Sequence, residues 1–144
     1  MKPTKHSVAL VLTDAAGRTL VVERPDEPGE ELPGIWGLPA GTALPGEGLE
    51  ACARRVAAAK LGIALEAPTR LATGRVERPG YHLELTLMAA RLAPGSRVRL
   101  APAPAGATTT YHPAAEWLAD AQARLGPGAA RGSLCCQLFI ELGR

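Results

Sequence analysis

The chain has few aromatic residues and few cysteines, and each shortage excludes a class of structure. Phe, Trp and Tyr together make up 3% of the 144 residues, so the core must be built from Val, Leu, Ile and Ala. The cysteines, Cys52, Cys135 and Cys136, are odd in number and include no Cys-x-x-Cys pair. A disulfide framework or a zinc site is therefore not expected. The cysteine usage instead predicts a reduced, cytoplasmic compartment.

A dominant charge and a long apolar run are also missing. Sixteen Lys and Arg residues stand against 14 Asp and Glu, which leaves a net charge of +2, and the basic residues do not cluster. Nucleic acid is therefore not expected as a partner. The apolar run at 7–12 is too short for a signal peptide or a membrane span. The sequence thus predicts no targeting segment and no membrane partner.

What is present predicts a single α/β domain over residues 1–144, since 47% of the residues are hydrophobic and 21% charged. Strands are expected at 7–12, 18–23, 69–78 and 81–92, with a further short strand at 97–100 and another beginning at 116 and running into a helical turn by 125. Helices are expected at 49–61, ending at Gly62, and at 134–142, with Ser133 as N-cap. Segments 101–110 and 126–132 are expected to be loops. The order of elements predicts helices packed on a mixed sheet.

The most informative segment begins at Gly41. Five residues separate Gly41 from Glu47, seven more lead to Arg55, and Gly62 and Ile63 close the pattern. This spacing resembles the Nudix box, which reads Gly, five residues, Glu, seven residues, Arg-Glu-apolar-x-Glu-Glu, one residue, Gly-apolar. The preceding hairpin, the run 36–39 and the pair 116–117 also resemble this superfamily, so the resemblance covers essentially the whole chain. It implies a mixed sheet sandwiched between helices, hydrolysis of pyrophosphate bonds in nucleoside diphosphate derivatives, and Mg²⁺ or Mn²⁺ as cofactor.

The chain departs from this box where the family has its metal-binding glutamates. Val56, Ala59 and Lys60 occupy those positions, and Ala40 stands where the family's motif has a glycine. Spacings of three and four residues predict that positions 56, 59 and 60 share one helical face. Mg²⁺ requires oxygen ligands, and this face offers none. We therefore expect a weakly active or inactive homologue that binds a nucleotide or another diphosphate compound.

The box remnants provide the candidate site residues. Glu47 and Arg55 resemble the pair that braces the loop against the helix in this family. They are the catalytic candidates, and Glu47 is also the candidate metal ligand. Gly41, Lys60 and Arg55 are the candidate ligand-binding residues, because two cationic side chains could hold a phosphate without metal. By analogy with relatives that use a base outside the box, Glu84 and Glu116 are further catalytic candidates.

Two alternatives remain open at this point. An active pyrophosphohydrolase could rebuild a metal site from Glu47 and acids outside the box, among them Glu30, Glu31 and Glu77. A protein-interaction or regulatory module, with a homodimer as one assembly, is the other alternative. The histidines at 6, 82 and 112 fit no metal-ligand spacing and are expected to be structural or exposed. Substrate specificity is expected to lie in the loops 24–34 and 101–110.

Overall fold

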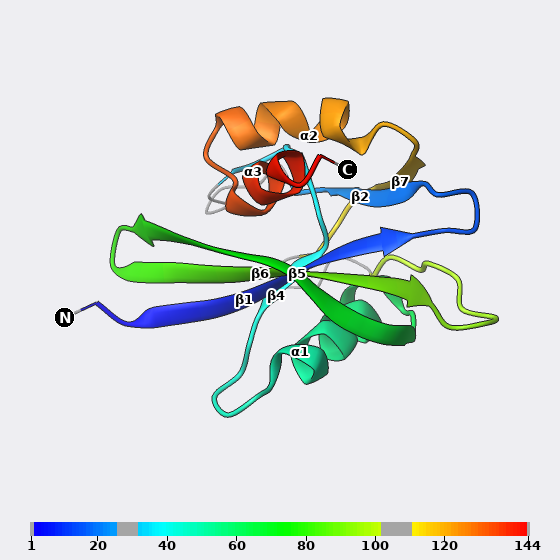
Figure 1. Cartoon of the computed structure of the whole chain (residues 1–144), viewed down its shortest axis with the longest axis horizontal. Helices are drawn as coiled ribbons and strands as arrows, with labels where there is room; N and C mark the ends of the chain where they lie inside the picture. Colours follow the sequence, from blue (N-terminus) through cyan, green and yellow to red (C-terminus); the bar gives the residue numbers. More distant parts are fainter. Residues whose placement is uncertain (1, 26–31, 102–110, 144) are drawn as a thin grey trace.

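One mixed sheet with helices on both of its faces organises the chain (Figure 1). The computed structural model describes residues 2–25, 32–101 and 111–143. Within these ranges the strands are β1 (Thr4–Thr13), β2 (Thr19–Glu23), β3 (Trp36–Gly37), β4 (Ala40–Thr42), β5 (Leu65–Arg78), β6 (Tyr81–Leu92) and β7 (Ala115–Leu118). The helices are α1 (Leu49–Val56), its π-helical continuation η1 (Ala57–Leu61), α2 (Ala121–Ala130) and α3 (Leu134–Glu141).

The strand order is β3-β2-β1-β6-β5, with β4 paired to β1 and β7 paired to β2. β1 and β6 run parallel, and the other described pairings are antiparallel. The helices α2 and α3 cover one face of this sheet and α1 covers the other (Figure 1). The expected mixed sheet between helices is therefore confirmed.

Two hydrophobic clusters, one on each face of the sheet, explain why the run in β1 is apolar at every position. Val8, Leu10 and Leu12 pack with residues of α1 and η1. Ala9 and Val11 pack with residues of α2 and α3. Because side chains alternate across a strand, a strand covered on both faces cannot alternate apolar with polar residues. The central position of β1 thus follows from its sequence.

The helix expected at 49–61 exists but changes its winding halfway. α1 is α-helical to Val56, and the chain then widens into the π-helical η1, where the Gly62 N–H donates to the carbonyl of Ala57, five residues earlier. Gly62 ends the helix with a φ of 64°, as expected from a left-handed C-terminal glycine. Single π turns inside helices shift the side-chain register. A purely α-helical periodicity therefore misplaces the side chains that follow residue 56.

Three further predictions were wrong or incomplete. No strand forms at 97–100; instead Arg99 N–H donates to the carbonyl of Leu61 at 2.6 Å, so this segment caps the end of η1. Most of the segment 126–132 is helical rather than a loop, because α2 continues to Ala130 with Pro127 inside it and Gly128 packed closely against the backbone of Trp36; only residues 131 and 132 form a turn. Ser133 occupies the N-cap position of α3, but its hydroxyl makes no capping hydrogen bond and lies 3.5 Å from Cys135 Sγ.

Candidate functional site

Gly41, the first residue of the box, is a glycine because β4 lies very close to α1 at this position. Gly41 pairs with Val8 of β1. A Cβ atom added at Gly41 would lie 2.5 Å from Cγ2 of Val56, which is closer than two carbon atoms can approach. Val56 itself is 2% exposed and belongs to the core cluster beneath α1. Position 56 is therefore a packing position that fixes how close strand and helix come.

Glu47 and Arg55 join the loop before α1 to the helix itself. The Arg55 Nε–H donates to Glu47 Oε2 at 2.8 Å, and the Arg55 Nη2–H donates to Glu47 Oε1 at 2.9 Å. The same Nη2 also donates to the carbonyl of Thr42 at 2.8 Å. The backbone N–H of Leu44 donates to Glu47 Oε1 at 3.1 Å. Both oxygens of this carboxylate thus accept hydrogen bonds from within the loop and helix.

These contacts hold Glu47 in its ionised form. The hydrogen bonds from the Arg55 guanidinium, followed by the one from the Leu44 backbone, lower the pKa of Glu47 from 4.5 to about 2. The reciprocal contact raises the pKa of Arg55. A carboxyl group whose pKa lies so low is a poor proton acceptor at neutral pH. The geometry therefore suits a structural brace better than a general base.

Lys60 bridges back to the strand beside Gly41. Its ammonium group donates a hydrogen bond to the carbonyl oxygen of Ala40, the first residue of β4. Ala59, one residue earlier, is exposed, and Val56 is buried. The three box positions expected to share one face therefore have three different environments, because η1 is π-helical. Only position 60 presents a charged group toward β4.

His112 is a residue whose environment the sequence did not predict. It is 5% exposed, and its ring Nδ1 lies 3.3 Å from the carbonyl oxygen of Glu23. Because a carbonyl only accepts, Nδ1 is the donor, which leaves Nε2 without a hydrogen and, among the described residues, without a partner. Burial, then the positive charge of Lys60, lower the pKa of His112 from 6.5 to about 4, and Arg24 acts in the same direction. Two cationic side chains, Lys60 of η1 and Arg24 after β2, thus disfavour the protonated form of His112.

The acids proposed outside the box are engaged elsewhere. Glu84 on β6 lies 3.6 Å from His6 Nδ1, and Glu116 on β7 lies 3.3 Å from Arg124 of α2. Glu77 pairs with Lys2 at 2.9 Å. None of these three contacts involves a box residue. Glu30, Glu31 and parts of the two segments expected to determine specificity, 24–34 and 101–110, lie outside the described residues.

The box positions present in this chain do not fit a divalent metal ion. Val56 and Ala59 have no donor atom, and Lys60 carries a positive charge that repels a cation. In residues 2–25, 32–101 and 111–143, no group of three or more His, Cys, Asp and Glu side chains is placed to hold a metal. The described helices also include none that is long and apolar enough to cross a membrane.

Comparison with known proteins places this fold and spacing in a family. The family model described as NUDIX domain matches residues 3–129. Among solved structures, a MutT NUDIX hydrolase from Burkholderia pseudomallei is 25% identical, with a TM-score of 0.67 over 82% of this chain and 84% of that one. The ORF135 protein of E. coli is 19% identical, with a TM-score of 0.71 over 98% and 91% of the two chains. The MutT protein from Methanosarcina mazei Go1 is also 19% identical, with a TM-score of 0.72 over 99% and 97%.

Among curated protein sequences, none matches this chain significantly. The family match nevertheless spans most of the chain, and the described sheet and helices have the fold of these hydrolases. Members of this family generally use divalent metal ions and act on nucleotide derivatives. By sequence match and by fold, the chain belongs to the NUDIX domain family.

Proposed function

We propose that this chain binds a nucleotide derivative through its phosphates without a metal ion, and hydrolyses it slowly or not at all. The observation that carries the proposal is the ammonium of Lys60 hydrogen-bonded to Ala40, inside the box. An ammonium fixed at this place supplies positive charge where the family uses metal ions. A phosphate bound there would gain a charge-assisted hydrogen bond without any divalent cation.

The surroundings of Lys60 favour an anion. Lys60 and Arg24 both lower the pKa of His112, so the field at this imidazole is positive. A phosphate group would offset this positive field. Arg55, which the sequence suggested as the second cation of the site, is instead held by Glu47 and Thr42. We therefore assign the second cationic position to Arg24 rather than to Arg55.

Weak hydrolysis follows from the same contacts. Three hydrogen bonds direct the carboxylate of Glu47 toward Arg55 and Leu44, and one carboxylate does not make up a site for the metal ions that this kind of hydrolysis uses. Metal ions supply several kcal/mol of transition-state stabilisation in this kind of reaction. Since about 1.4 kcal/mol corresponds to a tenfold change in rate, their loss leaves turnover near the uncatalysed background.

The test measures binding of ADP and of inorganic pyrophosphate in EDTA by isothermal titration calorimetry. We expect binding that Lys60→Met weakens roughly tenfold or more, since one charge-assisted hydrogen bond contributes about 1.5–3 kcal/mol. Lys2→Met is the matched control, because Lys2 is exposed and pairs with Glu77 instead. It should leave the affinity unchanged.

Three outcomes would contradict the proposal. Mg²⁺- or Mn²⁺-dependent turnover of ADP-ribose, dinucleoside polyphosphates or nucleoside triphosphates, abolished by Glu47→Gln, would show an active hydrolase with a rebuilt metal site. Absence of both turnover and metal-free binding would leave an interaction module as the better explanation. Equal affinities for the wild type and Lys60→Met would also remove Lys60 from the site.

A further inference from the structure

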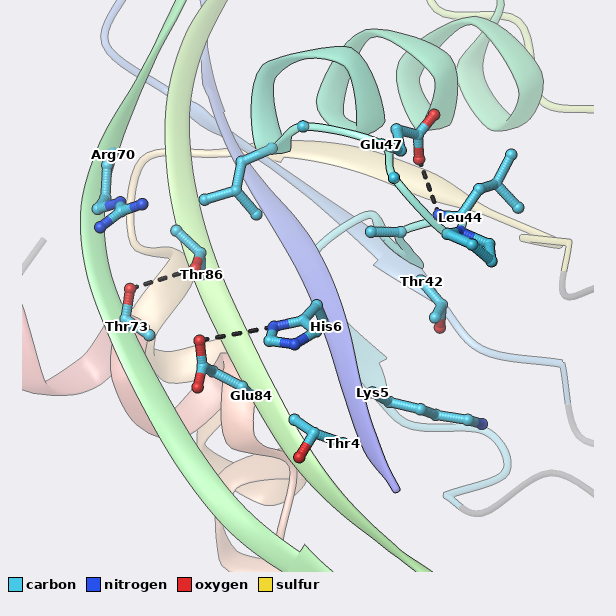
Figure 2. A pocket seen from close by; sticks show the side chains of 15 residues that line it. Thr4, Lys5, His6, Thr42, Leu44, Glu47, Arg70, Thr73, Glu84 and Thr86 are labelled. Carbon is cyan, nitrogen blue, oxygen red and sulfur yellow. Dashed lines mark hydrogen bonds and ion pairs between the residues drawn. The ribbon is translucent and has the colours of Figure 1, made fainter.

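A trough lies on the α1 side of the sheet, between the loop that precedes α1 and the first residues of β1 (Figure 2). Its volume is about 600 Å³, within the range of small-molecule sites. One wall is the loop 42–49, and the floor comes from β1, β6 and β5. Lys60, Arg24 and His112 do not line it. The trough is therefore separate from the phosphate site proposed above.

The floor of the trough is polar in a part of the sheet that continues a hydrophobic face. His6, Glu84 and Thr86 occupy the same side of the sheet as the core residues Val8 and Met88, because alternate residues of a strand share a face. Where α1 no longer covers this face of the sheet, the apolar side chains give way to side chains that form hydrogen bonds. Polar residues are expected on any sheet face that no helix covers. Here they also line a cavity large enough for a small ligand.

The polar groups of the floor form two pairs that Figure 2 shows side by side. Thr73 Oγ1 and Thr86 Oγ1 lie 3.1 Å apart, and His6 Nδ1 lies 3.6 Å from a carboxylate oxygen of Glu84. Thr86 is 4% exposed, so its hydroxyl has a fixed position, whereas the Glu84 side chain is 35% exposed and can accept further hydrogen bonds. The floor thus offers hydroxyl, imidazole and carboxylate groups on one surface.

The opposite wall is mostly apolar. Ala43, Leu44, Pro45 and Leu49 line it, and Leu44 is 54% exposed, which is unusual for a large hydrophobic side chain. A ligand between the two walls would contact hydrocarbon on one side and hydrogen-bonding groups on the other.

The charges of the trough argue against a strongly charged ligand. Arg70 and Glu84 are lining residues of opposite charge, and Glu47 is neutralised by its ion pair with Arg55 at 2.8 Å. Lys5 also lines the trough, but its ammonium lies over the ring of Tyr81, 4.5 Å from the centroid. The described lining residues include no Phe, Tyr or Trp, and the one aromatic ring among them, the imidazole of His6, already faces the carboxylate of Glu84 at 3.6 Å.

We infer that this trough binds a neutral polyhydroxylated compound, a mono- or disaccharide or the sugar part of a larger molecule. The hydroxyl groups of such a ligand would donate to Glu84 and exchange hydrogen bonds with Thr73 and Thr86. Its C–H surface would pack on Leu44 and Pro45. The ligand would need no metal, and its binding does not depend on the phosphate site at Lys60.

The test records ¹H–¹⁵N spectra of the full chain during titration with D-ribose, D-glucose and sucrose. At least one sugar should shift the backbone amide signals of His6, Thr73, Glu84 and Thr86 in a saturable manner. Glu84→Gln should weaken that binding tenfold or more, because the carboxylate accepts stronger hydrogen bonds than an amide does. Glu66→Gln on β5 is the matched control, because Glu66 is exposed and does not line the trough; it should change nothing.

Thr73→Val provides a second variant in case Glu84→Gln alters the fold. Thr73 is exposed, so its replacement leaves the core intact, and it should also weaken sugar binding. Three results would overturn the inference: no saturable shift with any of the sugars, shifts that survive both variants, or shifts induced at these amides by the zwitterion glycylglycine and not by a sugar. Sugar binding that persists in Lys60→Met would confirm that the two sites are independent.

Discussion

Acidification should destabilise this protein through His112 before its carboxylates are protonated. The pKa of His112 is lowered from 6.5 to about 4, so the unfolded state takes up the proton first. The stability that comes from keeping this imidazole neutral is complete above pH 6.5 and is lost as the pH falls toward 4. Proton linkage with these two pKa values removes about 2 kcal/mol of unfolding free energy by pH 5 and about 3 kcal/mol by pH 4.

The structure explains why the folded state resists protonation. The Nδ1–H group already donates to Glu23, so a second proton would have to sit on the buried Nε2. There it would find no acceptor among the described residues, and Lys60 would repel it. Moving a charge into such surroundings is costly unless it is paired.

Urea denaturation at about pH 7.5 and about pH 5 measures this loss, and His112→Asn tests its origin. The asparagine keeps a donor for the carbonyl of Glu23 but cannot be protonated. The variant is expected to be less stable at neutral pH, yet its loss on acidification should be smaller by about 2 kcal/mol. His82→Gln, near the start of β6, should retain the full loss. The reasoning is refuted if the wild type and His112→Asn lose equal stability between the two pH values.

Three further predictions follow from the box. Gly41→Ala should lower the free energy of unfolding by about 1–3 kcal/mol, because the added Cβ would lie 2.5 Å from a methyl group of Val56. Urea titration should show a smaller loss when the same substitution is made in a Val56→Ala background. Equal losses in the two backgrounds would contradict the packing argument. The lowered pKa of Glu47 stabilises the folded state above pH 4.5, and this stability is lost as the pH falls from 4.5 to about 2. Glu47→Gln should therefore abolish the part of acid unfolding that falls in this pH range. Circular dichroism against pH measures this, and an unchanged profile would contradict the role of Glu47 as a brace. Lys60→Met should raise the pKa of His112 while burial keeps it below 6.5, as followed by NMR titration of the imidazole; an unchanged pKa would mean that the two groups do not interact.

Much of the fold could be predicted from the sequence because its signals are local. The apolar run of β1, the turn at Asp14 and the glycine at 62 each determine the conformation of a few neighbouring residues. The side chain of Asp14 accepts from the backbone N–H of Ala16 and of Arg18, as its turn role requires. The box spacing likewise follows from short contacts within one loop and one helix.

What could not be predicted depends on contacts between distant segments. The burial of His112 depends on its meeting the carbonyl of Glu23, 89 positions earlier. The helical conformation of 126–130 depends on Gly128 packing against Trp36 and Cys136, whereas Gly and Pro favour a loop locally. The π turn in η1 moved Ala59 away from Val56, and nothing in an alanine-rich stretch distinguishes π from α winding.

Three of the departures from the box, Ala40, Val56 and Lys60, belong to one set of contacts between β4 and the helix, whereas Ala59 is exposed. Ala40 and Gly41 are consecutive in β4; the first accepts the hydrogen bond of Lys60, and the second packs on Val56. A glutamate at position 60 alone would place a carboxylate against the carbonyl of Ala40, and neither group could donate. A glutamate at position 56 alone would bury a charge in the core without a partner. Restoring a metal site therefore requires the substitutions together with the ion, because each one alone destabilises the contact between β4 and α1.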